Sequence, residues 1–140
     1  MADTKLSSML AAVPMFERLS KRQLKAIANA SEVVEYVAGQ SIVREGESGD
    51  SFYVVLHGQA KVSANGRTVH RAMPGDHFGE IALLDGGPRS ATVTSETPMT
   101  LVRLSRKAFF DRLDRDPEMA IALMETMARM IRRVDRSLAR

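Results

Sequence analysis

Cysteine is absent from this 140-residue sequence, and so is tryptophan. Without cysteine the chain can form no disulfide, no thiolate zinc site, no cysteine-ligated iron–sulfur cluster and no cysteine nucleophile. The three histidines, His57, His70 and His77, never stand one residue apart, which is the spacing that a metal-dependent dioxygenase or isomerase on a β-roll would need. We therefore expect a protein that is not an enzyme and that carries neither a metal nor a cofactor.

Long apolar runs are also absent. Residues 1–13 hold none of the length that a signal peptide or a membrane span requires, so we expect a cytoplasmic protein without a membrane span. The hydrophobic content of 44% and the charged content of 26% are those of an ordinary globular protein. The length suits one domain over residues 1–140.

Positive charge is concentrated at the two ends of the chain. Residues 1–30 hold five basic and two acidic side chains, residues 31–102 hold five and nine, and residues 103–140 hold ten and six. A basic end of this kind is either a solvated helix face or a surface for nucleic acid, membrane or an acidic protein. No helix-turn-helix pattern follows it, so the sequence has no DNA-binding motif.

The pattern of apolar residues predicts helices at both ends and strands between them. Residues 6–30 read as N-terminal helices, with Ser20 and Gln23 forming a capping-box pattern. Residues 31–105 contain seven or eight short strand candidates separated by glycine turns, and the Asn65-Gly66 pair predicts a tight hairpin. Strands this short and this evenly spaced are typical of a β-sandwich or a closed roll.

Helical periodicity returns over about residues 106–139. Asp116 followed by Pro117 is typical of a helix start. The apolar stripe that follows has spacings of three and four residues and consists of Leu123, Met124, Met127, Met130, Ile131, Val134 and Leu138.

The stretch from Phe78 to Val93 has the strongest chemical character. Arg89 is the only Lys or Arg between Arg71 and Arg103. A short helical turn after Gly79 would expose N–H groups suited to an anion, and Arg89 would add a guanidinium that matches phosphate oxygens. Glu80 would repel phosphate but would accept hydrogen bonds from sugar hydroxyls. The stretch therefore indicates a sugar phosphate, and the alternative is an ion pair between Glu80 and Arg89 with glycines that only make turns.

Three segments resemble the cyclic nucleotide-binding domain, the family of the catabolite activator protein sensor domain, cyclic-nucleotide-gated channel domains and the regulatory subunits of cAMP-dependent protein kinase. The resemblance extends over about residues 10–134. Its segments are the cassette Phe78-Gly79-Glu80-x-Ala82-Leu83 with Pro88-Arg89-Ser90-Ala91-Thr92-Val93, the stretch Gly46-Glu47-x-Gly49-Asp50-x-Phe52-Tyr53-Val54-Val55-x-x-Gly58, and Val13-Pro14-Met15-Phe16-x-x-Leu19-Ser20. It implies an α+β fold: an eight-stranded antiparallel, jelly-roll-like β-roll with N-terminal helices, a short cassette helix and a C-terminal helix.

The resemblance also implies the roles of the cassette residues. Glu80 would accept from the ribose 2′-hydroxyl, and Arg89 would pair with the oxygens of the cyclic phosphate. The backbone N–H groups of Gly79, Ile81 and Ala82 would complete the cradle, and Ser90 would add a phosphate or base contact. Serine after the arginine occurs in bacterial members that bind cAMP, whereas a hydroxyl there favours cGMP in the kinase branch. The expected ligand is cAMP, with cGMP as the alternative.

The C-terminal helix has several interpretations. It would pack on its own roll, pair with a second copy through the methionine-rich stripe, or cap the nucleotide from around Arg129, Met130 or Arg133. The expected function is a non-enzymatic cyclic nucleotide sensor that repositions this helix and acts on an effector protein. The alternative is a ligand-independent interaction module acting through the basic helix. The sequence fits a stand-alone sensor or a module of a longer chain, and the initial Met1 favours the first.

Overall fold

The computed structural model describes residues 2–138, with side chains from Lys5 onward. The chain forms two compact units. One unit consists of residues 30–109 and holds all the strands. The other combines residues before 30 with residues after 109 and is helical. Helix α4 (Arg106–Arg115) begins in the first unit and ends in the second.

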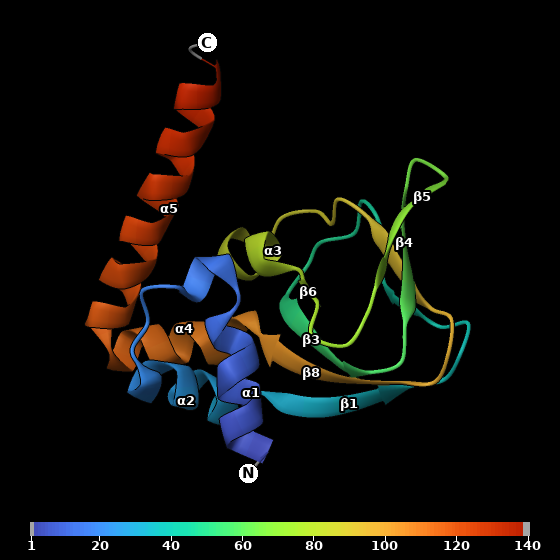
Figure 1. The fold of residues 1–140 in the computed structure, drawn as a ribbon, viewed down its shortest axis with the longest axis horizontal. Helices are drawn as coiled ribbons and strands as arrows, with labels where there is room; N and C mark the ends of the chain where they lie inside the picture. The colour runs from blue at the N-terminus through green and yellow to red at the C-terminus, as the bar shows by residue number, and fades with distance from the viewer. Residues whose placement is uncertain (1, 139–140) are drawn as a thin grey trace. The chain divides into compact units, whose positions relative to one another are not determined.

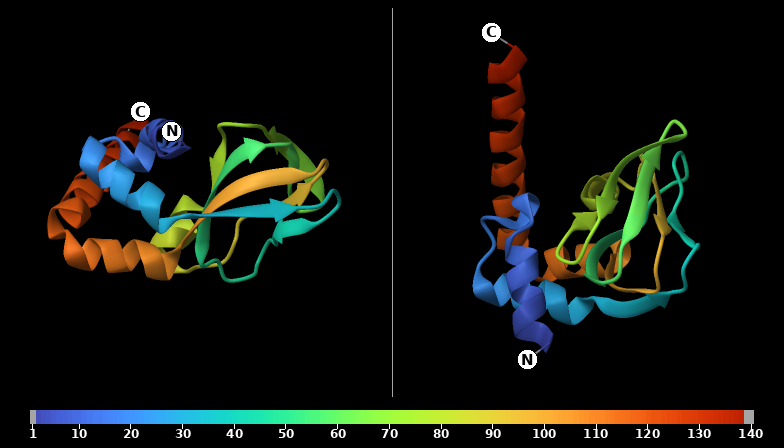
Figure 2. Two further views of the ribbon diagram at one scale, coloured as in Figure 1. Left: turned by 90° about the horizontal axis from the view of Figure 1, so that it is seen from below. Right: turned by 45° about the vertical axis from the view of Figure 1, so that its right-hand side comes forward.

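The β unit contains eight antiparallel strands in two sheets of four, as the sequence predicts (Figures 1 and 2). One sheet has the order β1-β8-β3-β6, from β1 (Glu32–Tyr36), β8 (Met99–Ser105), β3 (Ser51–His57) and β6 (His77–Phe78). The other has the order β2-β7-β4-β5, from β2 (Ser41–Val43), β7 (Thr92–Ser95), β4 (Ala60–Ala64) and β5 (Arg67–Ala72). Only β6 has no counterpart among the predicted strands, because two residues without β-branching give no strand pattern.

Both sheets contribute side chains to one apolar core inside the roll. Strand β3 is the most buried, and its alternate residues Tyr53 and Val55 point into this core. The core residues are Tyr53, Val55, Ala60, Val62, Ala72, Val93, Met99 and Leu101. The short helix α3 (Glu80–Asp85) also packs against β3, so this strand supports the cassette as well as the roll interior.

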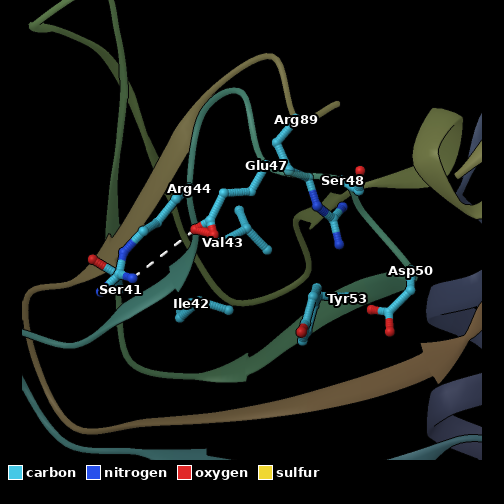
Figure 3. A pocket seen from close by; sticks show the side chains of 9 residues that line it. All are labelled: Ser41, Ile42, Val43, Arg44, Glu47, Ser48, Asp50, Tyr53 and Arg89. Carbon is cyan, nitrogen blue, oxygen red and sulfur yellow. Dashed lines mark ion pairs between the residues drawn. The ribbon is translucent and has the colours of Figure 1, made fainter. Parts of the chain in front are cut away.

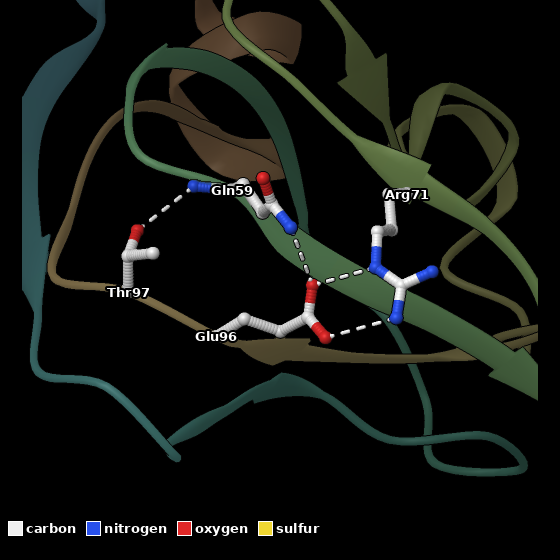
Figure 4. Close-up of polar contacts among 4 residues, drawn as sticks. All are labelled: Gln59, Arg71, Glu96 and Thr97. Carbon is white, nitrogen blue, oxygen red and sulfur yellow. Dashed lines mark hydrogen bonds and ion pairs between the residues drawn. The ribbon is translucent and has the colours of Figure 1, made fainter.

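The hairpin between β4 and β5 turns at Asn65 and Gly66, as the sequence predicts. Both residues have positive φ, 54° and 77°, which matches a two-residue turn. At the other end of the hairpin, the Arg71 guanidinium on β5 donates two hydrogen bonds of 2.9 and 3.2 Å to Glu96, as Figure 4 shows. These bonds hold the pKa of the Glu96 carboxyl below its usual range. The contact links the edge strand of its sheet to the turn between β7 and β8.

The helical unit contains α1 (Ala2–Ala11), the short 3-10 helix η1 (Pro14–Phe16), α2 (Lys21–Ala30), the end of α4 and α5 (Pro117–Leu138). The predicted capping box is present, because the Gln23 N–H donates to Ser20 Oγ at 3.1 Å and the Ser20 N–H donates to Gln23 Oε1 at 2.9 Å. The Gln23 amide also donates to Asp116 Oδ2 at 3.1 Å. The same side chain therefore caps α2 and ties it to the start of α5.

Helix α5 changes character along its length. Met119, Leu123 and Thr126 are buried, whereas every residue from Ile131 to Leu138 is exposed. The predicted apolar stripe is therefore mostly in contact with solvent in its second half. None of the helices among residues 2–138 combines the length and the apolar character needed to cross a membrane.

Candidate functional site

The cassette begins where β6 turns into α3. Gly79 makes this turn with φ of 91°, a left-handed conformation that side chains other than glycine rarely adopt. Its carbonyl accepts the first helical hydrogen bond, from Leu83 N at 3.0 Å, and Gly86 ends the helix with φ of 65°. The single helical turn predicted after Gly79 is therefore present. Its first N–H groups have no acceptor within the helix and point out of its N-terminal end.

Arg89 is held by backbone hydrogen bonds on both sides. Its N–H donates to Glu47 O and its carbonyl accepts from Gly46 N, each at 2.8 Å. The side chain is 9% exposed, and its Nη2 donates to Ser51 O at 2.8 Å. The Nη1 atom is buried and has no hydrogen-bond partner among residues 2–138. A buried cation without an anionic partner is costly, so this guanidinium is suited to binding an anion.

Two glycines allow the guanidinium to lie where it does. A Cβ on Gly79 would lie 2.5 Å from Arg89 Nη1 and 2.7 Å from Ser51 O. A Cβ on Gly49 would lie 2.5 Å from Arg89 Nε and 2.6 Å from the Ala82 Cβ. Atoms do not approach this closely without displacement, so residues with side chains at positions 49 and 79 would move Arg89. Here the glycines are more than turn formers, because they make room for the arginine.

Glu80 does not pair with Arg89. Its Oε2 lies 2.7 Å from His77 Nδ1, and no ion pair within the described residues 2–138 joins Glu80 to the Arg89 guanidinium. The alternative interpretation of the sequence, an ion pair across the cassette, is therefore not the arrangement in this structure. Glu80 is half-buried and keeps its second carboxylate oxygen available to another donor.

A cavity of about 230 Å³ opens beside Arg89 (Figure 3). The figure shows the Arg89 guanidinium pointing into it, on the side toward Tyr53. Arg44 and Glu47 form an ion pair of 3.9 Å at another side of the cavity. The lining residues are Ser41, Ile42, Val43, Arg44, Glu47, Ser48, Asp50, Tyr53 and Arg89.

Tyr53 closes the inner side of this cavity. It is 5% exposed, and its ring stacks on Phe78, the first cassette residue, with 5.0 Å between ring centres. Burial, followed by the nearby Tyr36, raises the pKa of the Tyr53 hydroxyl to about 12, against a smaller opposite effect of Arg103. The phenol is therefore neutral and can donate or accept a hydrogen bond.

The structure brings the predicted site residues together only in part. Arg89 lines the cavity, and Gly79 and Ala82 lie next to its guanidinium or to Gly49. Ile81 and Ser90 are exposed and do not line the cavity. Arg129, Met130 and Arg133 belong to α5 in the helical unit, not to the unit that holds the cassette.

Sequence reasoning missed most of the cavity wall. The residues on β2 and on the turn that follows it form no binding motif by which the sequence could have identified them as part of a site. Asp50 and Tyr53 lie inside the glycine-rich stretch 46–58, which carried the family resemblance, and this stretch was the available signal. Among residues 2–138, no group of three or more His, Asp or Glu side chains could hold a metal ion.

The model of the family described as the cyclic nucleotide-binding domain matches residues 33–116, which is more than half of the chain. The chain belongs to this family. The match covers the β-roll, the cassette and the cavity, and it confirms the assignment made from the three sequence motifs.

Known relatives include both cGMP- and cAMP-linked proteins. A cGMP-dependent protein kinase of Toxoplasma gondii is 45% identical over 70% of this chain and 10% of its own length. A cAMP-dependent protein kinase regulatory subunit of Eremothecium gossypii is 39% identical over 71% of this chain and 22% of its own length. This chain therefore spans between a tenth and about a fifth of the length of these relatives.

Among solved structures, the N-terminal domain of a transcriptional regulator from Streptomyces coelicolor A3(2) is similar to this chain. The two share 29% sequence identity with a TM-score of 0.84, over 93% of this chain and 94% of that domain. The likeness extends over the helices at both ends as well as the roll, because it covers nearly all of both chains.

Proposed function

We propose that this chain is a non-enzymatic sensor that binds cAMP at the cassette 78–93, with cGMP as the alternative ligand. The buried Arg89 guanidinium carries this proposal, because its Nη1 has no partner among the described residues and its side chain lines a cavity. A cyclic phosphate offers the single negative charge and the exocyclic oxygens that a guanidinium binds.

The neighbouring residues have complementary roles in the proposal. The N–H groups at the start of α3, from Gly79 to Ala82, would donate to the same phosphate, since they lie next to Arg89 at the end of a helix. Glu80 would accept from the ribose 2′-hydroxyl, and Ser90 would contribute a hydroxyl to the phosphate or the base. Ser90 is also the feature that favours cAMP, because the bacterial members of the family carry serine there.

The output would pass through α5. We infer that α5 has two positions and that ligand binding shifts the population from one to the other. The size of the shift is set by the difference in ligand affinity between these two conformations. The exposed residues Met124, Ile131, Val134 and Leu138, with the half-buried Met127, follow alternating spacings of three and four residues. This is the spacing of a coiled-coil seam, and it supports a homodimer through α5. Arg129, Arg132, Arg133 and Arg136 lie on the opposite side of the helix, so their charges would not meet in the seam.

Calorimetric titration with cAMP, cGMP and AMP tests the ligand assignment. We expect Arg89→Ala to weaken cAMP binding by about 30-fold to several thousandfold, because removing one partner of a desolvated charged pair costs about 2–5 kcal/mol. Arg44→Ala is the matched control, since Arg44 lines the same cavity but is exposed and already paired with Glu47. Equal affinity of Arg89→Ala and the parent protein would refute the site, and no heat with either cyclic nucleotide would refute the function.

A further inference from the structure

Glu80 is in contact with one side chain of the preceding strand. Its Oε2 lies 2.7 Å from His77 Nδ1, and the two side chains are 34% and 26% exposed. Because an ionised carboxylate only accepts hydrogen bonds, a hydrogen bond at this contact requires the proton to be on His77 Nδ1. The contact occupies one carboxylate oxygen and leaves Oε1 for a second donor.

His77 is itself fixed by the sheet. It belongs to β6, where it pairs with Val54 of β3. Its ring centre lies 5.8 Å from that of Phe52, a side chain that is 1% exposed. The imidazole is therefore anchored to the most buried strand of the roll, whereas Glu80 opens the short helix α3. The contact therefore joins the Glu80 carboxylate to a side chain of the sheet.

We propose that His77 is a positioning residue that holds the Glu80 carboxylate in the orientation that accepts the ribose 2′-hydroxyl. A glutamate side chain loses rotamer entropy when it is immobilised, and this entropy loss lowers affinity when it occurs on binding. With His77 in place, the entropy is lost when the protein folds, so the ribose meets an acceptor that is already oriented. The inference depends on the proposed function, because it gives His77 a role only toward a ribose bound at Glu80.

The choice of ligand separates this role from a general effect on folding. The 2′-deoxy analogue of cAMP lacks the hydroxyl that Glu80 would accept from, and it keeps the cyclic phosphate and the base. A variant that acts only through Glu80 should weaken cAMP binding and leave binding of the 2′-deoxy analogue nearly unchanged. A variant that disturbs the fold should weaken both.

Two variants of the full chain form a matched pair. His77→Phe keeps a ring against Phe52 and removes the donor, whereas His77→Gln keeps an amide donor toward Glu80. In calorimetry, His77→Phe should bind cAMP with an affinity about tenfold lower than that of the parent protein, or about 1.4 kcal/mol. Its affinity for the 2′-deoxy analogue should fall by less than about threefold. His77→Gln should recover most of the cAMP affinity. Equal losses for the two ligands, or no loss for cAMP, would overturn the proposal.

A measurement on the parent protein does not depend on whether the variants fold. Long-range nitrogen–proton NMR correlations identify which ring nitrogen of His77 carries the proton. The proposal requires a protonated Nδ1 in the free protein, and an unprotonated Nδ1 would overturn it. If the parent protein binds no cyclic nucleotide, the proposed function itself fails. If it binds cAMP but His77→Phe shows no selective loss, only the role of His77 fails.

Discussion

The space that Gly79 leaves for Arg89 can be tested by adding one methyl group. In Gly79→Ala, the new Cβ would lie 2.5 Å from Arg89 Nη1 and 2.7 Å from Ser51 O, at φ of 91°. The matched control is Gly75→Ala, which has φ of 95° and nothing within 4 Å of its new Cβ. Both variants carry the same backbone cost, about 1–2 kcal/mol for a left-handed alanine. The difference between them therefore measures the contact with Arg89 and Ser51.

We expect urea denaturation to show an unfolding free energy lowered by about 1–2 kcal/mol in Gly75→Ala. In Gly79→Ala the loss should reach about 2–5 kcal/mol, because overpacking adds about 1–3 kcal/mol when a backbone atom is among those displaced. The cAMP affinity should fall at least about tenfold in Gly79→Ala, because the guanidinium is displaced from its bond to Ser51 O, and it should be unchanged in Gly75→Ala. Equal stability losses in the two variants, together with equal affinities, would refute the argument that Gly79 makes room for Arg89.

Two other predictions concern the roll interior and α5. Because burial raises the pKa of Tyr53 from about 10 to about 12, the stability that its neutral form contributes is fully present below pH 10 and is lost as the pH rises through about 12. Denaturant titrations over this range should show the loss in the parent protein and not in Tyr53→Phe; parallel curves would contradict it. Ile131→Glu should weaken a dimer by at least about 100-fold in sedimentation equilibrium, because the seam would bury one exposed Ile131 from each copy, whereas Arg133→Glu on the opposite face should not. A parent protein that stays monomeric at high concentration would contradict the seam.

Local sequence patterns predicted the parts of the fold that depend on local physics. The Ser20 and Gln23 pair makes the capping box, and Asn65-Gly66 makes the hairpin turn, because in both cases the interacting groups lie within a few residues of each other. The alternating apolar residues gave seven of the eight strands. Strand β6 was missed because its two residues are held by pairing with Tyr53 and Val54 on β3, a partner that is distant in sequence.

The candidate site shows the same division. The cassette motif identified Arg89 and Glu80, because a lone guanidinium and an acid between glycines are unusual in an acidic segment. The motif did not show that Gly49 comes within contact distance of the arginine, or that Ser51 O accepts from it, since both residues come from about 40 positions earlier in the chain. It also left open whether Glu80 pairs with Arg89, and the structure pairs Glu80 with His77 instead.

The sequence by itself determined the family, the order of helices and strands, and the presence of a lone arginine near an acid, because short motifs and the period of apolar residues carry these features. Only the tertiary structure decided which partners those charges have. The guanidinium donates to Ser51 O on β3, which is 38 positions away in the chain, so this partner depends on the tertiary fold. The carboxylate's neighbour His77 lies only three residues away, but spacing alone did not decide whether Glu80 meets His77 or Arg89.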